Sequence, residues 1–88
     1  MAKPIELVEL SSRGCEHCEN FRKFWHSIEK DWPNVKFRDV DLATPEGEEM
    51  LMRYMTLASP GIILNSELFS TGPVNQQEFL DKLKELSE

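Results

Sequence analysis

The 88-residue sequence has few of the features that define several large classes of protein. Its longest apolar runs are short, residues 61–64 being typical, whereas roughly 20 apolar residues are needed to span a bilayer. Ten lysines and arginines face sixteen aspartates and glutamates. The resulting net charge of −6 argues against a nucleic-acid binder, which needs a basic patch. The first ten residues hold no apolar stretch of signal-peptide length. We therefore expect a cytoplasmic protein with neither membrane nor nucleic-acid partners.

Cysteine is also scarce, and its placement is informative. Cys15 and Cys18 are the only two cysteines, and two residues separate them. A disulfide at this spacing closes too small a loop to stabilise a fold through chain entropy, so the pair indicates redox or metal chemistry. Zinc takes four ligands, and only His17 and His26 remain to supply the others. Because His17 lies between the cysteines, a zinc site would need a second subunit. We expect a redox pair and no metal; a metal-binding pair or two inert core thiols are the alternatives.

The spacing of apolar residues predicts one α/β domain over residues 1–88, because strand-like alternation and helix-like spacing follow one another along the chain. Thr44-Pro45 and residues 75–78 have the composition of helix starts. The expected elements are a strand over 5–10, a helix over 15–31, a strand over 35–42, a helix from 45 that ends at 58–61, strands over 62–64 and 68–70 with a turn at 65–67, and a final helix from 75–78 onward. The order β-α-β-α-β-β-α predicts a four-stranded mixed sheet with helices on both faces and a parallel first pair joined by a right-handed crossover.

Each predicted helix carries an apolar stripe that indicates its buried face. The residues expected to point inward are Phe21, Phe24, Trp25, Ile28 and Trp32 in the first helix, Met50, Leu51, Tyr54 and Met55 in the second, and Phe79, Leu80, Leu83 and Leu86 in the third.

The cysteine pair falls between the first strand and the first turn of the first helix. Free N–H groups and the helix dipole stabilise an anion there, which lowers the pKa of a thiol below its ordinary value of ~8.5. The thiolate of Cys15 is stabilised most because Cys15 lies at the very end of the helix, whereas Cys18 lies one turn further in. We therefore expect Cys15 to be the attacking thiolate and Cys18 the resolving thiol.

The sequence resembles the thioredoxin/glutaredoxin superfamily over essentially its whole length. It shares a Cys-x-x-Cys between strand and helix, a Ser-Pro before the third strand, a β-hairpin, a glycine and a C-terminal helix. The resemblance implies a thioredoxin-like fold in which Cys15 and Cys18 are the redox pair. It also implies that Pro60 is the cis-proline facing that pair, the alternative being an ordinary trans proline that ends a helix.

The same resemblance implies further site residues. The backbone of Ser59 would pair with an extended substrate chain, and we expect Gly61 and Gly14 to lie in the same substrate-binding region. Glu9, six residues before Cys15, matches a buried acid that is proposed to relay a proton for the second cysteine. The alternative is a surface glutamate in a strand that faces water.

The charged residues around the cysteines admit two interpretations. A histidine at the position of His17 resembles the disulfide isomerases, where it stabilises the thiolate; the alternative is a solvated loop histidine. Glu16 and Glu19 carry negative charge and are expected to destabilise the thiolate. Arg13, Arg22 and Lys23 are interpreted as solvated charges, the alternative being contact with acidic partners or with the carboxylates of glutathione.

The resemblance implies a thiol–disulfide oxidoreductase that needs no bound cofactor. We expect a monomer that reduces protein disulfides and is itself reduced by a thioredoxin reductase-like enzyme or a small thiol. A glutathione-dependent glutaredoxin is the alternative enzyme, although residues 58–60 and Gly72-Pro73 differ from the Thr-Val-Pro and Gly-Gly that hold glutathione in glutaredoxins. The non-enzymatic alternative is a thioredoxin-fold metal-binding or interaction module.

Overall fold

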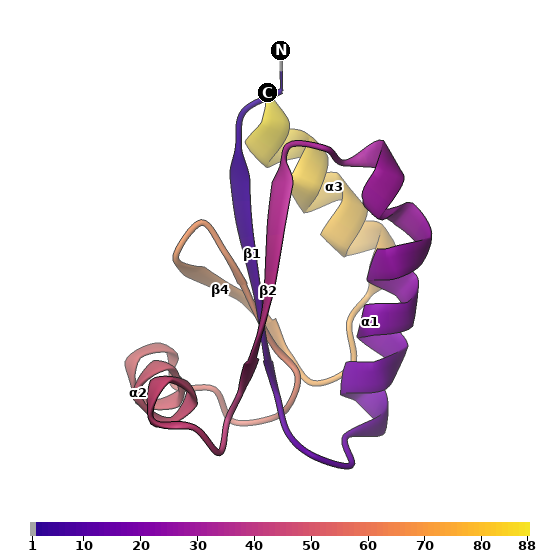
Figure 1. The fold of residues 1–88 in the computed structure, drawn as a ribbon. Coiled ribbons are helices and arrows are strands. Elements are labelled where there is room, and N and C mark those ends of the chain that lie inside the picture. Colours follow the sequence, from indigo (N-terminus) through magenta and orange to yellow (C-terminus); the bar gives the residue numbers. More distant parts are fainter. Residues whose placement is uncertain (1) are drawn as a thin grey trace.

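The order of strands and helices follows the spacing of apolar residues in the sequence. The computed structural model describes residues 2–88 and has the predicted order β-α-β-α-β-β-α (Figure 1). The elements are β1 (Ile5–Ser11), α1 (Glu16–Ile28), the 3-10 helix η1 (Glu29–Asp31), β2 (Val35–Asp41), α2 (Pro45–Tyr54), β3 (Gly61–Leu64), β4 (Glu67–Thr71) and α3 (Gln76–Ser87). In the part of the chain that the structure describes, no helix is both long and apolar enough to cross a membrane.

The four strands form one mixed sheet in the order β2-β1-β3-β4. β1 and β2 run parallel and are paired along their whole length, with α1 in the connection between them. β3 runs antiparallel to β1, with Gly61 opposite Leu10, and β4 runs antiparallel to β3. The start of β3 therefore lies beside the end of β1, which is the end that leads into α1.

Helices cover both faces of the sheet because the central strands carry apolar side chains on both. α1 and α3 lie on one side of the sheet and α2 lies on the other (Figure 1). The larger core, under α1 and α3, consists of Ile5, Leu7, Phe21, Trp25, Ile62, Leu64, Phe79 and Leu83. The smaller core, under α2, consists of Leu10, Val40, Met50 and Ile63. β1 contributes residues to both cores, so both cores hold in place the strand whose end leads to the cysteines.

Local capping signals determine where α2 and α3 begin. Thr44 Oγ1 accepts a hydrogen bond from the N–H of Gly47 at 3.1 Å, and Pro45 is the first residue of α2. Asn75 Oδ1 accepts a hydrogen bond from the N–H of Glu78 at 3.0 Å at the start of α3. Both caps satisfy N–H groups that have no partner inside the helix, and both helices begin where the sequence predicts.

The ends of the helices differ from the prediction. α1 ends at Ile28 and continues only as the 3-10 turn η1. α2 ends at Tyr54 because Met55 takes a left-handed conformation with φ of 53°. The prediction that Leu51 and Met55 are buried is wrong, since their side chains are 38% and 70% exposed. Residues 55–60 consequently form a loop that leads from α2 back to the sheet.

The hairpin turn is tighter than predicted. Its two residues, Asn65 and Ser66, both have positive φ, 50° and 65°, which is the conformation of the two-residue turns whose twist matches that of the flanking strands. Glu67, expected in the turn, is the first residue of β4. Away from the turn, β3 begins one residue earlier than predicted, at Gly61, and β4 continues one residue further, to Thr71.

Candidate active site

Cys15 is the N-cap residue of α1, and its sulfur takes part in the cap. The backbone of Cys15 is extended, and its Sγ accepts a hydrogen bond from the N–H of Cys18 at 3.1 Å. Gly14, which comes before it, has φ of 75°, a conformation that L side chains rarely adopt, so the glycine permits the sharp entry from β1 into the helix. The end of the helix therefore directs an N–H donor at this sulfur.

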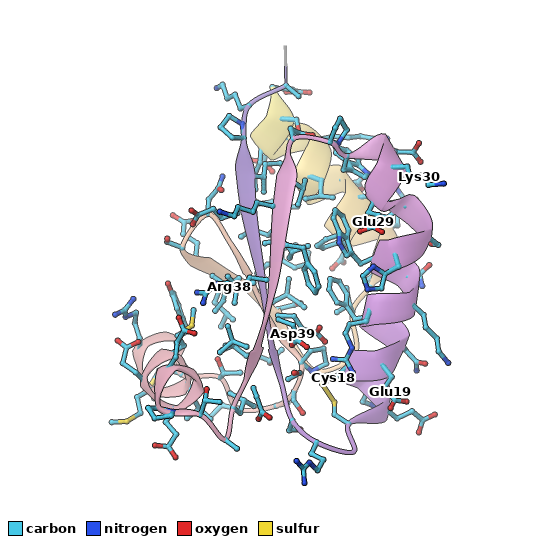
Figure 2. The ribbon with its side chains drawn as sticks, in the orientation of Figure 1. Cys18, Glu19, Glu29, Lys30, Arg38 and Asp39 are labelled. Atoms are coloured by element: carbon cyan, nitrogen blue, oxygen red, sulfur yellow. A yellow bond between two sulfur atoms is a disulfide. The ribbon has the colours of Figure 1, made fainter. Side chains whose placement is uncertain are left out.

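Cys15 and Cys18 are joined by a disulfide, with their Cα atoms 5.2 Å apart (Figure 2). The two sulfurs have different surroundings, because Cys18 is fully buried on the inner face of α1 whereas Cys15 is half-buried. An incoming reagent can therefore reach Cys15 and not Cys18. This asymmetry is the one that the sequence predicts from the position of each cysteine in the helix.

A second donor reaches Cys15 from the loop before β3. The hydroxyl of Ser59 donates a hydrogen bond to Cys15 Sγ at 3.3 Å, and the Oγ atoms of Ser59 and Ser12 are 3.1 Å apart. Hydrogen bonds to a sulfur favour its anionic form, so both donors would stabilise the Cys15 thiolate once the disulfide is reduced. The sequence predicts a role for the backbone of Ser59 alone and gives no signal for its hydroxyl or for Ser12.

The loop that carries Ser59 is fixed on both sides. The Ser59–Pro60 peptide bond is cis, Pro60 is buried, and its carbonyl accepts a hydrogen bond from the N–H of Gly72 at 3.0 Å. A Cβ on Gly61 would lie 2.6 Å from Cγ2 of Thr56, which is itself buried. The absence of a side chain at Gly61 therefore lets Thr56 of this loop pack closely against the start of β3.

Glu9 is fully buried on the face of β1 that α1 covers, while Glu6 is exposed. Its two carboxylate oxygens lie 3.3 and 3.4 Å from Nη1 of Arg22 on α1. Arg22 also lies 3.7 Å from Asp39 on β2. Burial raises the pKa of Glu9 from an ordinary 4.5 to about 7, because loss of water around the carboxylate outweighs the attraction of Arg22, and the charge of Asp39 acts in the same direction as burial.

The interpretation of Arg22 as a solvated charge is wrong. Its side chain is only 29% exposed and forms the ion pair with Glu9. A sequence signal existed, because Arg22 lies four residues after Cys18 and so shares its face of the helix. Arg13 and Lys23 are exposed, as expected.

His17 is exposed in the first turn of α1 and lines an open groove of about 600 Å³ between α1 and the segment that leads into α3. Within residues 2–88, no hydrogen bond joins His17 to Cys15, so its role as a tuning residue stays a prediction. Across the same residues, no three side chains of His, Cys, Asp or Glu gather in a way that could hold a metal ion.

Comparisons with known proteins identify the fold. No protein-family model and no curated protein sequence matches the chain. Solved structures do match it. Thioredoxin from Fasciola hepatica has a TM-score of 0.73 at 18% identity, and the match covers 96% of this chain and 82% of that one.

Two further structures give the same result. Mitochondrial thioredoxin 3 from Saccharomyces cerevisiae, in its oxidized form, has a TM-score of 0.75 at 16% identity, with 96% of this chain and 80% of that one covered. Thioredoxin O2 from Arabidopsis thaliana, in the oxidized state, has a TM-score of 0.76 at 12% identity, with 98% and 77% covered. The chain therefore has the thioredoxin fold that its sequence predicts. At these identities the likeness shows the fold alone, and the chemistry depends on the residues around the disulfide.

Proposed function

We propose that the protein is a thiol–disulfide oxidoreductase that reduces disulfides in other proteins through a reversible Cys15–Cys18 disulfide. The observation that carries this proposal is the disulfide at the start of α1, in which one sulfur is accessible and hydrogen-bonded and the other is buried. A nucleophilic thiolate needs access and stabilisation, and a resolving thiol needs protection from competing reagents.

The reaction consists of two exchange steps. In the reduced protein the Cys15 thiolate attacks one sulfur of a substrate disulfide, that S–S bond breaks, and the released substrate thiolate takes a proton from water. The Cys18 thiol then loses its proton and its sulfur attacks Cys15 Sγ. The mixed disulfide breaks, the second substrate thiolate leaves and is protonated, and the Cys15–Cys18 disulfide forms. Two electrons pass from the two cysteines to the substrate.

Residues around the cysteines supply the supporting interactions. The Cys18 N–H and the Ser59 hydroxyl donate to Cys15 Sγ and stabilise its thiolate. Glu9 accepts the proton of Cys18, a role supported by its burial and by a pKa raised to about 7, close to neutral pH. His17, when protonated, adds a positive charge beside the thiolate.

The remaining site residues hold substrate. The backbone of Ser59 and the close-packed Gly61 receive the extended substrate chain on one side of the disulfide, and Gly14 leaves the other side open. In the cell the cycle is completed by a thioredoxin reductase-like enzyme or a small thiol, which returns two electrons to the disulfide. The protein acts as a cytoplasmic monomer without a bound cofactor.

Insulin reduction with dithiothreitol as the electron source tests the proposal. We expect the wild-type protein to accelerate insulin precipitation and Cys15→Ser to abolish the acceleration. Cys18→Ser should trap mixed disulfides with protein substrates on non-reducing gels, and Cys15→Ser should trap few or none. Wild-type protein no faster than dithiothreitol alone would refute the proposal, and stoichiometric metal in the purified protein would favour the metal-binding alternative. Equal trapping by the two variants would refute the assignment of roles.

A further inference from the structure

Arg22 lies at the boundary between a buried carboxylate and solvent. Glu9 has no exposed surface, whereas the Arg22 side chain is 29% exposed, and the guanidinium contacts both oxygens of the carboxylate. The guanidinium therefore joins the buried carboxylate to a partly exposed part of α1. An ionised carboxylate at this depth depends on a nearby cation, because burial by itself favours the neutral acid.

The same guanidinium serves a second carboxylate. Asp39 lies directly opposite Glu9 in the pairing of β1 with β2, and its carboxylate is 3.7 Å from Arg22. The hydroxyl of Ser11 donates to Asp39 at 2.7 Å and fixes its side chain. One cation thus stands between two acids, one fully buried and one 40% exposed.

The other elements around Glu9 contribute little charge. On β3 the residue opposite Glu9 is Ile62, which is apolar, and α2 lies on the other face of the sheet. α1 contributes Arg22 and, on the same helix face, Cys18, whose thiol is uncharged until it loses its proton. Figure 2 shows Asp39 on the side of β2 toward α1 and Arg38 on the side toward α2. Arg22 and Asp39 are therefore the two charged groups that act on Glu9.

We propose that Arg22 is a positioning residue that holds Glu9 in its ionised form, and that Asp39 opposes it by drawing on the same guanidinium. The proposal rests on the proposed function, in which Glu9 takes the proton of Cys18. In that step the Cys18 S–H bond breaks, the proton moves to the Glu9 carboxylate, and the Cys18 sulfur bonds to Cys15 as the mixed disulfide breaks. Glu9 later returns the proton to water. The balance between Arg22 and Asp39 therefore shifts the pH above which the resolving step is fast.

Two opposed variants test the balance. Arg22→Met removes the charge but keeps a long side chain over Glu9, and Arg22→Lys restores the charge. Asp39→Asn removes the competing acid. Arg38→Met is the matched control, because Arg38 is the neighbouring residue on β2 but pairs with Glu46 on the opposite face.

Two measurements are made on each variant. The first is the pH titration of the Glu9 carboxyl ¹³C chemical shift in the oxidised protein, which does not depend on activity. The second is the stopped-flow release of the second thionitrobenzoate from Ellman's reagent by the reduced protein, which follows the attack of Cys18 on Cys15.

In each variant the two readouts are expected to move together. Arg22→Met and Asp39→Asn are expected to move them in opposite directions. Arg22→Met should raise the Glu9 midpoint by about one pH unit, and Arg22→Lys should restore most of the wild-type value. Asp39→Asn should lower the midpoint, and Arg38→Met should leave it unchanged. The pH dependence of the second release should follow each shift.

Each failure has a separate meaning. Midpoints that stay fixed, or that move in the same direction in Arg22→Met and Asp39→Asn, would overturn the role of Arg22. A Glu9 midpoint that moves while the pH dependence of the second release stays unchanged would overturn the link between Arg22 and the resolving step. Wild-type protein that reduces no disulfide at all would refute the proposed function, while the ¹³C titration would still decide whether Arg22 controls Glu9.

Discussion

Replacement of Glu9 by glutamine is expected to stabilise the folded protein at neutral and higher pH. The wild-type pKa is raised from 4.5 to about 7 by burial, so ionising Glu9 in the folded state is costly. The difference of about 2.5 pH units, at about 1.4 kcal/mol each, corresponds to about 3 kcal/mol. Glutamine has almost the same shape and carries no charge, so it removes the cost.

The sign of the pH dependence follows from proton binding. Between pH 4.5 and about 7 the folded chain keeps the Glu9 proton and the unfolded chain has lost it, so the free energy of unfolding falls as pH rises through this window. Below the window the carboxyl is neutral in both states and the cost is absent. Glu9→Gln and the wild type should therefore have similar stability near pH 4 and differ by about 3 kcal/mol near pH 8.

Urea unfolding of the oxidised proteins, followed by the fluorescence of Trp25 and Trp32, measures this difference at each pH. The oxidised form is used so that neither cysteine titrates. Glu6→Gln is the matched control, because Glu6 is an exposed glutamate of the same strand and its replacement should change the pH profile little. A Glu9→Gln variant that gains no stability between these pH values, or that loses it, would refute the argument that burial dominates the ionisation of Glu9.

Three further substitutions have defined outcomes. Ser59→Ala removes a hydroxyl donor to Cys15 and should lower the rate of Cys15 alkylation below neutral pH by up to about ten-fold; an unchanged rate would mean that the hydroxyl does not stabilise the thiolate. Gly61→Ala places a methyl group against Thr56 and should reduce the free energy of unfolding in urea by about 1–3 kcal/mol, an effect that a neutral result would contradict. Asn75→Ala removes the α3 cap and should cost about 1 kcal/mol in the same assay, whereas Asn75→Asp, which keeps a cap acceptor, should cost little.

The parts of the fold that could be predicted from the sequence depend on local signals. Thr44 and Asn75 cap their own helices, and the alternation of β1 places Glu9 and Glu6 on opposite faces whatever surrounds the strand. The end of α2 could not be predicted in this way. An apolar stripe indicates a buried face only if another element covers that face. Met55 takes a left-handed conformation that ends the helix, and no element of the described chain covers its side chain.

The same distinction applies to the ion pair at Glu9. The burial of Glu9 follows from its place in the strand, one alternation after Leu7. Its partner Arg22 lies on a different element, and the contact depends on how α1 is rotated over the sheet. Only the spacing of Arg22 from Cys18 hints at that rotation, and spacing alone does not distinguish a solvated arginine from one that covers a buried acid.

The contact between Ser59 and Cys15 results from the strand order. These residues are 44 positions apart, and nothing in the sequence near either of them specifies the other. Because β3 runs antiparallel to β1 with Gly61 opposite Leu10, the residues just before Gly61 lie beside the residues just after Leu10. The first group contains Ser59, and the second leads through Ser12 to Cys15. The hydroxyl oxygen of Ser59 therefore lies 3.1 Å from Oγ of Ser12 and 3.3 Å from Sγ of Cys15. A shift of β3 by one residue would turn Ile62 toward α2 and Ile63 toward α1 and would carry Ser59 away from the sulfur. The two cores that fix the register of β3 therefore also fix the second hydrogen-bond donor to Cys15.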